Sequence, residues 1–325
     1  MHINTLDAID LARVPAGRVS PEVAFYLRNS RSPKTIEGYR WAWGRVLQIC
    51  GRRKLCPLPM SQETCCEILT ELADAGLAVG SVRLVLSAIA VAHRIAGEVT
   101  PVSSEAVRST VRGIARTFAD RKIRRVAAVT PIELRLVYDR LLLEPNRFAA
   151  MRDWTLLIIG FAGAFRASEI VALDTEDIDL REDRVVVMIG RSKTDQEGRG
   201  ASITIQAGNH PDICPVAAIR KWLQILPGQG PVFRPISGRG DHLLPKRLGV
   251  AAVAAIVKRH AAAMGLDDGA VAGHSLRAGF VTSTLSNEIP DTVVMDHTRH
   301  KTHESLAKYF RPRSFRVNMT EGSGL

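Results

Sequence analysis

The sequence predicts a two-domain protein in which an all-α N-terminal domain precedes a mixed, mainly α domain with a small antiparallel sheet. Three observations lead to this fold class. The 325 residues exceed what a single hydrophobic core usually organises. Apolar residues recur at helical spacing in several segments before residue 119, and the best β-strand patterns occur only in the second half. We therefore expect two separately packed domains.

Helix caps and helical periodicity define the N-terminal domain. Ser32 followed by Pro33 is typical of a helix start, because Ser can cap the helix and Pro at the first position loses no bonded N–H. Further helices are expected after Ser61, from Gly80 to a stop at Gly97, and after Ser103 and Ser104 as far as Phe118. We assign residues 32–118 to this helical domain and residues 1–31 to an N-terminal extension.

A basic segment, residues 119–129, lacks sustained periodicity and is predicted to be a linker. The second domain, residues 130–325 with a C-terminal tail, opens with Thr130 and Glu133 at the spacing of a capping box. The chain from residue 216 onward is expected to be mostly helical. The predicted helices are residues 131 onward, 147–164, 169–173, 250–264 and 303–309, and the predicted strands are residues 184–189 and 201–205.

The charge of the chain is strongly basic, with 44 Lys and Arg against 33 Asp and Glu and a formal net charge of +11. The basic excess is concentrated before Val126. Such a distribution fits contact with a polyanion such as duplex DNA, although charge alone fits a solvated basic face equally well.

Several classes of protein are disfavoured by the sequence. We expect no membrane span, because the longest near-continuous apolar stretch, residues 154–165, is shorter than the ~18 residues that a span needs. The N-terminus lacks a secretory signal, so a cytoplasmic location is expected. Five cysteines without a CxxC pair indicate neither a disulfide framework nor a zinc module.

Four short segments of the second domain combine cations, imidazoles or a phenol with small residues. Because positions i and i+3 share a helix face, His274 and Arg277 can converge on one ligand. Arg166 and Lys193 would complete a cationic pocket sized for a phosphate, since the fork of an Arg side chain bonds two oxygens at once. The segments are residues 165–170, 189–194, 273–279 and 299–310.

Tyr309 is the candidate nucleophile of this constellation. The ordinary pKa of a phenol is about 10, so an adjacent base and nearby cations would have to favour the phenolate during attack.

These segments resemble the catalytic motifs of the tyrosine recombinases, the lambda-integrase family, and are closest to its Cre-like and Xer-like simple members. The resemblance spans roughly residues 32–313. It implies a core-binding, SAM-like helical domain and a catalytic domain of the DNA breaking-rejoining fold. It also implies strand cleavage and rejoining through a 3′-phosphotyrosyl intermediate without metal or nucleotide cofactor. The implied partners are double-stranded DNA with an inverted-repeat core site and a synaptic tetramer of this chain.

The resemblance assigns roles to individual residues. Arg166 and Arg277 would grip the non-bridging oxygens of the scissile phosphate, and Lys193 would protonate the leaving 5′ oxygen. His274 would take or share the proton of Tyr309. Each of these residues is in the order that the family motifs require.

Two further positions are assigned by the same resemblance. His300, nine residues before the nucleophile, takes the phosphate-bonding position in preference to His297 or His303, and Glu169 would brace the site. The residue before His300 is Arg299, where many family members have Gly. That Arg would either add a phosphate contact or change the conformation of the loop.

The same residues allow other interpretations. Taken singly, a helix-end Arg, a loop Lys or a helical Tyr is more often structural or solvated, but the joint order and spacing argue against this here. A type IB topoisomerase uses similar chemistry, but the helical domain ahead of the linker favours site-specific recombination. A catalytically silent DNA-binding regulator is disfavoured because no catalytic position is lost. Integration, excision and resolution of a mobile or replicating element remain alternative outcomes.

Overall fold

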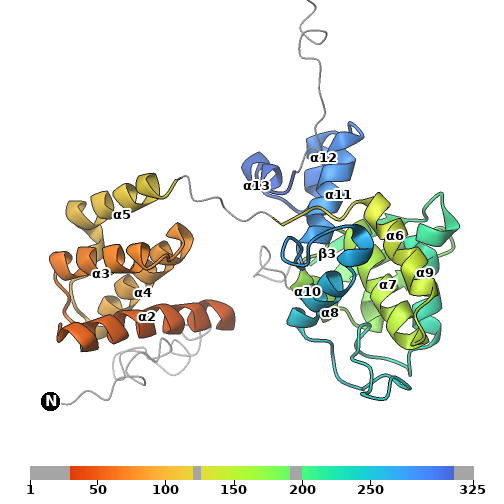
Figure 1. Cartoon of the computed structure of the whole chain (residues 1–325), viewed down its shortest axis with the longest axis horizontal. Coiled ribbons are helices and arrows are strands. Elements are labelled where there is room, and N and C mark those ends of the chain that lie inside the picture. Colours follow the sequence, from red (N-terminus) through yellow and green to blue (C-terminus); the bar gives the residue numbers. More distant parts are fainter. Residues whose placement is uncertain (1–29, 120–125, 191–199, 311–325) are drawn as a thin grey trace, which may run out of the picture. The chain divides into compact units, whose positions relative to one another are not determined.

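The computed structural model describes residues 30–119, 126–190 and 200–310 (Figure 1). The chain divides into two compact units, Met1–Ile123 and Arg124–Leu325, which we call unit 1 and unit 2. Unit 1 is helical, and unit 2 is mainly helical with one antiparallel sheet, so the predicted fold class is confirmed. The predicted N-terminal extension up to residue 29, most of the basic linker and the tail from residue 311 lie outside the described residues.

Unit 1 is built from two pairs of packed helices, α2 on α4 and α3 on α5. The side-chain oxygens of Ser32, Ser61 and Ser104 each accept a hydrogen bond from a backbone N–H in the first helical turn, at 3.2, 3.1 and 3.3 Å. The three Ser caps that the sequence predicts are therefore confirmed. The helices are α2 (Pro33–Arg53), α3 (Gln62–Asp74), α4 (Val79–Ala96) and α5 (Glu105–Thr117), with a 3₁₀ helix at Pro101–Ser103.

One helix of the described residues, α4, is long and apolar enough to cross a membrane by length and composition. Arg83 and Arg94 interrupt α4, so it lacks the continuous apolar run on which the expectation about a membrane span was based. Val82, Val85 and Ile89 of α4 are buried in the core of unit 1. His93 is buried on the same helix, and its ring nitrogens lie 3.0 Å from the Met60 N–H nitrogen and 2.8 Å from the Ile89 carbonyl oxygen. In this structure α4 is thus a core helix.

Unit 2 begins with α6, and the predicted capping box is present, with the Thr130 N–H donating to Glu133 Oε2 at 2.8 Å. The sheet has the order β1-β2-β3 and is antiparallel throughout. The elements are α6 (Pro131–Leu142), α7 (Arg147–Ala162), α8 (Ala167–Ala172), β1 (Ile178–Leu180), β2 (Arg184–Ile189), β3 (Ala201–Gln206), α9 (Pro215–Gln224), α10 (Val250–Arg259), α11 (Ser275–Ser286), α12 (Asp291–Thr298) and α13 (His303–Ala307) (Figure 1).

The centre of unit 2 is α7, which is buried along most of its length and packs against α6, α9 and α11. Trp222 of α9 is fully buried and donates its indole N–H to the Val232 carbonyl at 2.8 Å. Helix α7 ends at Ala162 and Gly163 is its C-cap. Ala164 follows with a φ of 46°, so the chain turns sharply there. This turn carries the chain from the core into α8.

Four sequence-based expectations differ from the structure. Strand β1 was not predicted, because three residues are too short to show an alternating pattern. Residues 227–249, expected to be mostly helical, are irregular, with two isolated β-bridges. Helix α10 ends at Arg259 instead of residue 264, since the chain tightens into the 3₁₀ helix Ala262–Met264 before Gly265 in the left-handed region. Helix α13 ends at Ala307, before Tyr309.

Gly279 of α11 generates a stability prediction. A β-carbon at this position would lie 1.7 Å from the Val129 carbonyl oxygen, and Val129 in turn donates its N–H to the Ser275 carbonyl at 3.1 Å. We expect Gly279→Ala to lower the free energy of unfolding by about 3 kcal/mol, the upper end of ordinary overpacking costs, as measured by urea denaturation. Gly113→Ala, where no atom lies within 4 Å, is the control and should stabilise the chain by up to about 1 kcal/mol. Unchanged stability of the Gly279 variant would contradict the packing argument.

Candidate active site

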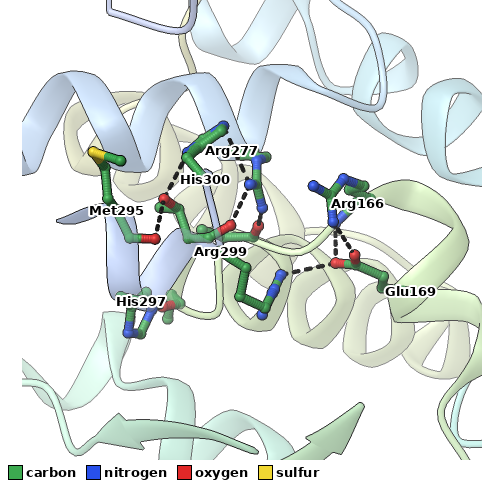
Figure 2. Close-up of polar contacts among 10 residues, drawn as sticks. Arg166, Glu169, Arg277, Met295, His297, Arg299 and His300 are labelled. Atoms are coloured by element: carbon green, nitrogen blue, oxygen red, sulfur yellow. Dashed lines mark hydrogen bonds and ion pairs between the residues drawn. The ribbon is translucent and has the colours of Figure 1, made fainter. Parts of the chain in front are cut away.

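Arg166 and Glu169 meet at the start of α8 (Figure 2). Arg166 precedes the helix in an extended conformation, and its side chain is 14% exposed. The Glu169 carboxylate, 2% exposed, accepts the Arg166 backbone N–H at 2.9 Å through Oε2 and the Arg166 guanidinium through Oε1. One carboxylate therefore holds both the backbone and the side chain of Arg166.

Arg277 lies one turn into α11 and is fully buried, with 0% of its surface exposed. Its guanidinium donates to the carbonyl oxygens of Ala164 and Thr298, and its Nη2 lies 3.2 Å from His300 Nε2 (Figure 2). Within the described ranges no carboxylate forms an ion pair with Arg277. Burial, together with the positive charge of neighbouring arginines, lowers its pKa to about 10. The result is a buried cation that no carboxylate of the described residues contacts.

His300 follows α12 and has both ring nitrogens in contact with protein atoms. Its Nδ1 lies 2.7 Å from Thr298 Oγ1, which itself donates to the Val294 carbonyl at 2.6 Å. Because the Thr hydroxyl proton is used, Nδ1 carries the imidazole proton and Nε2 accepts from Arg277. Burial and the positive charges of Arg277 and its neighbours lower the pKa of His300 to about 4, so the ring is neutral at neutral pH.

The Tyr309 ring is surrounded by these groups. Its centroid lies 5.0 Å from that of His300 and 6.2 Å from that of His274, and the Arg277 guanidinium carbon lies 5.5 Å from it. Tyr309 follows α13 and packs against a small apolar cluster that includes Leu306. This cluster is separate from the main core of unit 2. The phenol ring is therefore next to one guanidinium and two imidazoles.

The structure thus places six of the seven predicted site residues around one point of unit 2. His274 is exposed at the N-terminal end of α11, and Arg277 lies one turn further along the helix, as their spacing suggests. Lys193 lies outside the described residues, in the connection between β2 and β3. The six residues are Arg166, Glu169, His274, Arg277, His300 and Tyr309.

The other two candidate histidines have different surroundings. His297 stacks on Phe280, with ring centroids 4.7 Å apart, and its Nε2 lies 2.8 Å from the Ala162 carbonyl oxygen. Burial lowers the pKa of His297. His303 is exposed and lies 3.0 Å from Asp291. Of the three histidines, His300 is the one that contacts Arg277.

Two groups that hold this arrangement were not predicted from the sequence. Thr298 supplies a carbonyl to Arg277 and a hydroxyl to His300, and Ala164 supplies the other carbonyl. Neither residue type signals such a role, and only the position of Thr298 two residues before His300 points to it. The described residues contain no group of three or more His, Cys, Asp or Glu side chains that could hold a metal ion.

The lowered pKa of His300 predicts a specific pH dependence. In the unfolded chain the pKa returns to its ordinary value near 6.5, so the unfolded state binds more protons between pH 4 and 6.5. We expect the free energy of unfolding to fall as the pH drops through this window, and His300→Gln to lose that part of the dependence. An NMR titration of the labelled imidazole should give a midpoint near 4, and a midpoint near 6.5 would contradict the described environment.

Comparisons with known proteins identify the family of the chain. Residues 136–314 match the model of the phage integrase family. The chain is 33% identical over 300 residues to an integrase/recombinase XerD homologue of Selenomonas ruminantium, covering 90% of this chain and 85% of that protein. It is 29% identical over 144 residues to tyrosine recombinase XerC of Alcanivorax borkumensis, covering 42% and 40%.

Solved structures share the fold. The XerH recombinase in a post-cleavage complex with a palindromic difH substrate has a TM-score of 0.65 at 13% identity, covering 93% of this chain and 82% of that chain. A lambda integrase dimer bound to a core site has a TM-score of 0.58 at 20% identity, covering 87% and 90%. The chain therefore belongs to the phage integrase family of tyrosine recombinases, which carry out site-specific recombination by cleaving and rejoining DNA.

Proposed function

We propose that this recombinase cleaves DNA by attack of Tyr309 on a phosphodiester, which gives a 3′-phosphotyrosyl intermediate. The observation that carries the proposal is the buried charge of Arg277, which has no contacting carboxylate among the described residues and lies 5.5 Å from the Tyr309 ring. A buried cation is unfavourable unless an anion completes it. A DNA phosphate bound there would lie beside the phenol that attacks it.

The reaction exchanges one phosphodiester for another. The Tyr309 oxygen forms a bond to phosphorus, the bond from phosphorus to the 5′ oxygen breaks, and the 5′ oxygen leaves with a proton. Attack of a 5′-hydroxyl on the phosphotyrosine reverses the step and rejoins the strand. Because the substrate and the intermediate both contain a phosphodiester, the energy of the bond is conserved. The proposed reaction therefore needs no metal or nucleotide cofactor to balance it.

Arg166 and Arg277 are proposed to bind the two non-bridging oxygens. Their guanidinium groups are close enough that the charge of Arg166 contributes to the lowered pKa of Arg277. Arg277 Nε is buried and has no hydrogen-bond partner among the described residues, so it has donor capacity left. Charge grows on the phosphate oxygens as the pentacoordinate state forms, so donors fixed beforehand stabilise that state more than the substrate.

The histidines are proposed to manage the proton and the phosphate. His274, at the N-terminal end of α11, would take or share the Tyr309 proton. For His300 to donate to a phosphate oxygen through Nε2, the imidazole proton must move from Nδ1 to Nε2. Thr298 Oγ1 can then turn its hydroxyl from the Val294 carbonyl to Nδ1, so the same pair of atoms stays bonded.

Two residues complete the proposed site. Lys193, in the connection between β2 and β3, would protonate the leaving 5′ oxygen. An ammonium on a flexible stem suits this task, because it donates a proton without the fixed geometry of a guanidinium. Glu169 would keep Arg166 in place through the backbone and side-chain contacts described above.

The partners are proposed from charge and from the relatives. The net charge of +11 suits binding to the DNA backbone, with a slope of log K on log salt of about −0.9 per neutralised phosphate. Solved relatives include a lambda integrase tetramer on a Holliday junction. We infer an inverted-repeat core site, a synaptic tetramer of this chain and a cytoplasmic location, with residues 32–118 as the core-binding domain, 119–129 as the linker and 130–325 as the catalytic domain.

Covalent trapping tests the proposed function. Nicked duplexes carrying the inverted repeats beside the gene release the short 5′ strand after cleavage, so an active enzyme accumulates as a denaturant-resistant adduct. Tyr309→Phe removes only the nucleophilic oxygen and should bind the duplex normally in a mobility-shift assay while forming no adduct. Tyr138→Phe is the matched control, because it also removes one phenol oxygen. Tyr138 is on α6 and packs against Trp154, with ring centroids 5.0 Å apart.

The two variants separate the possible outcomes. Wild-type and Tyr138→Phe proteins should form the adduct equally. If Tyr309→Phe formed the adduct at the wild-type level, Tyr309 would not be the nucleophile. Specific binding without any adduct from the wild-type protein would identify a DNA-binding regulator instead of an enzyme.

A further inference from the structure

Arg299 occupies a backbone position that favours glycine. Its φ of 59° lies in the left-handed region, and it ends α12, with its N–H bonded to the Asp296 carbonyl and the next N–H bonded to the Met295 carbonyl at 3.0 Å. A residue with a β-carbon is sterically disfavoured in this conformation, which is why helices so often end on Gly. Glu288 has the same φ of 59°, so the backbone conformation alone assigns no role to Arg299, and the contacts of its side chain decide what it does.

That side chain joins α12 to α8. Arg299 Nη2 donates to Glu169 Oε2 at 2.8 Å, and the guanidinium lies over the Phe165 ring at 5.6 Å. The Arg299 side chain is 12% exposed. Figure 2 shows it extending toward Glu169, whereas His300, the next residue, is directed to Arg277. Arg299 thus contacts Glu169, the residue that holds Arg166, and directly precedes His300 in the chain.

The contact changes the charge balance of the site. Three guanidinium groups, those of Arg166, Arg277 and Arg299, lie around one carboxylate, Glu169, so this group carries a net charge of about +2. With Gly in place of Arg299, the Glu169 carboxylate would be shared with Arg166 alone and the same group would carry about +1. Without Arg299, the ion pair between Arg166 and Glu169 would be stronger. The Arg166 guanidinium would then interact less strongly with a phosphate.

We propose that Arg299 is a positioning residue, which takes up part of the Glu169 charge so that Arg166 stays available to the scissile phosphate, and which fixes the main chain that carries His300. The inference rests on the proposed function. The contact that favours this role over direct contact with the phosphate is the ion pair from Arg299 Nη2 to Glu169 Oε2, which directs the guanidinium to the carboxylate that also holds Arg166. Arg299 acts through Glu169.

Three variants separate charge from backbone conformation. Arg299→Gly relieves the left-handed backbone and removes the charge, whereas Arg299→Lys keeps the charge with one ion pair to Glu169. Glu288→Gly is the backbone control, because Glu288 is exposed in the turn before α12 and has the same φ of 59°. We expect Arg299→Gly to fold with an unchanged or higher Tm and to cleave about 10- to 100-fold more slowly in single turnover, the range typical of an outer-shell partner. Arg299→Lys should recover most of the rate, and Glu288→Gly should cleave normally.

An NMR titration supplies a readout that a purely structural role would not change. The charged groups facing His300 are Arg277 from α11, Arg166 from α8 and Arg299 itself, beside the Tyr309 ring. Removal of one of three cations should raise the pKa of His300 in Arg299→Gly but not in Arg299→Lys. This measurement needs no DNA, so it stands even if covalent trapping fails and the proposed function falls.

A double-mutant cycle with Glu169→Gln tests whether Arg299 acts through the carboxylate. In the Glu169→Gln background, Arg299→Gly should cost less than threefold in cleavage rate, because the shared carboxylate is already neutral. An equal loss in both backgrounds would place Arg299 on the phosphate itself and overturn the proposal. Wild-type cleavage by Arg299→Gly, or an Arg299→Lys variant as slow as Arg299→Gly, would also overturn it.

Discussion

The burial of one positive charge, the guanidinium of Arg277, is the constraint on which the rest of the site depends. Its donors are directed to the Ala164 and Thr298 carbonyls and to the His300 ring, and within the described residues no contacting carboxylate balances it. Its pKa is lowered to about 10, so it remains protonated at neutral pH. A buried cation in this state is stabilised by an anion that comes from outside the described residues. The fold therefore maintains a charge that suits a phosphodiester.

The surrounding elements keep that charge in place. The turn after α7 presents the Ala164 carbonyl. Two residues later, Arg166 is the N-cap of α8. The other end of α8 is fixed by Arg247, whose Nη1 donates to the Val171 and Leu173 carbonyls at 2.8 and 3.1 Å. Tyr309, in contrast, belongs to a separate small apolar cluster. Arg277, the proposed phosphate-binding residue, thus follows a residue of the main core, Leu276, whereas Tyr309, the proposed nucleophile, packs against the smaller cluster.

Local signals predicted the parts of the fold that local interactions determine. The Ser caps and the capping box of α6 were read from the sequence because cap and partner lie three residues apart. The irregular segment 227–249 was not, because its bridge from Pro231 pairs with the distant Asp174 and its other bridge is a single residue pair without a strand pattern. Helix α4 shows that a helix apolar enough for a membrane can be a buried core helix. The candidate site residues followed from motif order and spacing. The ion pair of Arg299 with Glu169 joins residues 130 positions apart, so only the structure revealed it.

The central claim is that the Arg277 charge is matched to the charge of the scissile phosphate. A methylphosphonate at the scissile position replaces one non-bridging oxygen with a methyl group and removes its charge. Arg277→Ala should cleave the ordinary phosphodiester about 10²- to 10³-fold more slowly than the wild-type protein, the usual cost of one such donor. The same variant should recover most of the cleavage rate on the methylphosphonate duplex, a result that also shows that it folds. An equal defect on both substrates, in a variant with a native circular dichroism spectrum, would contradict the account.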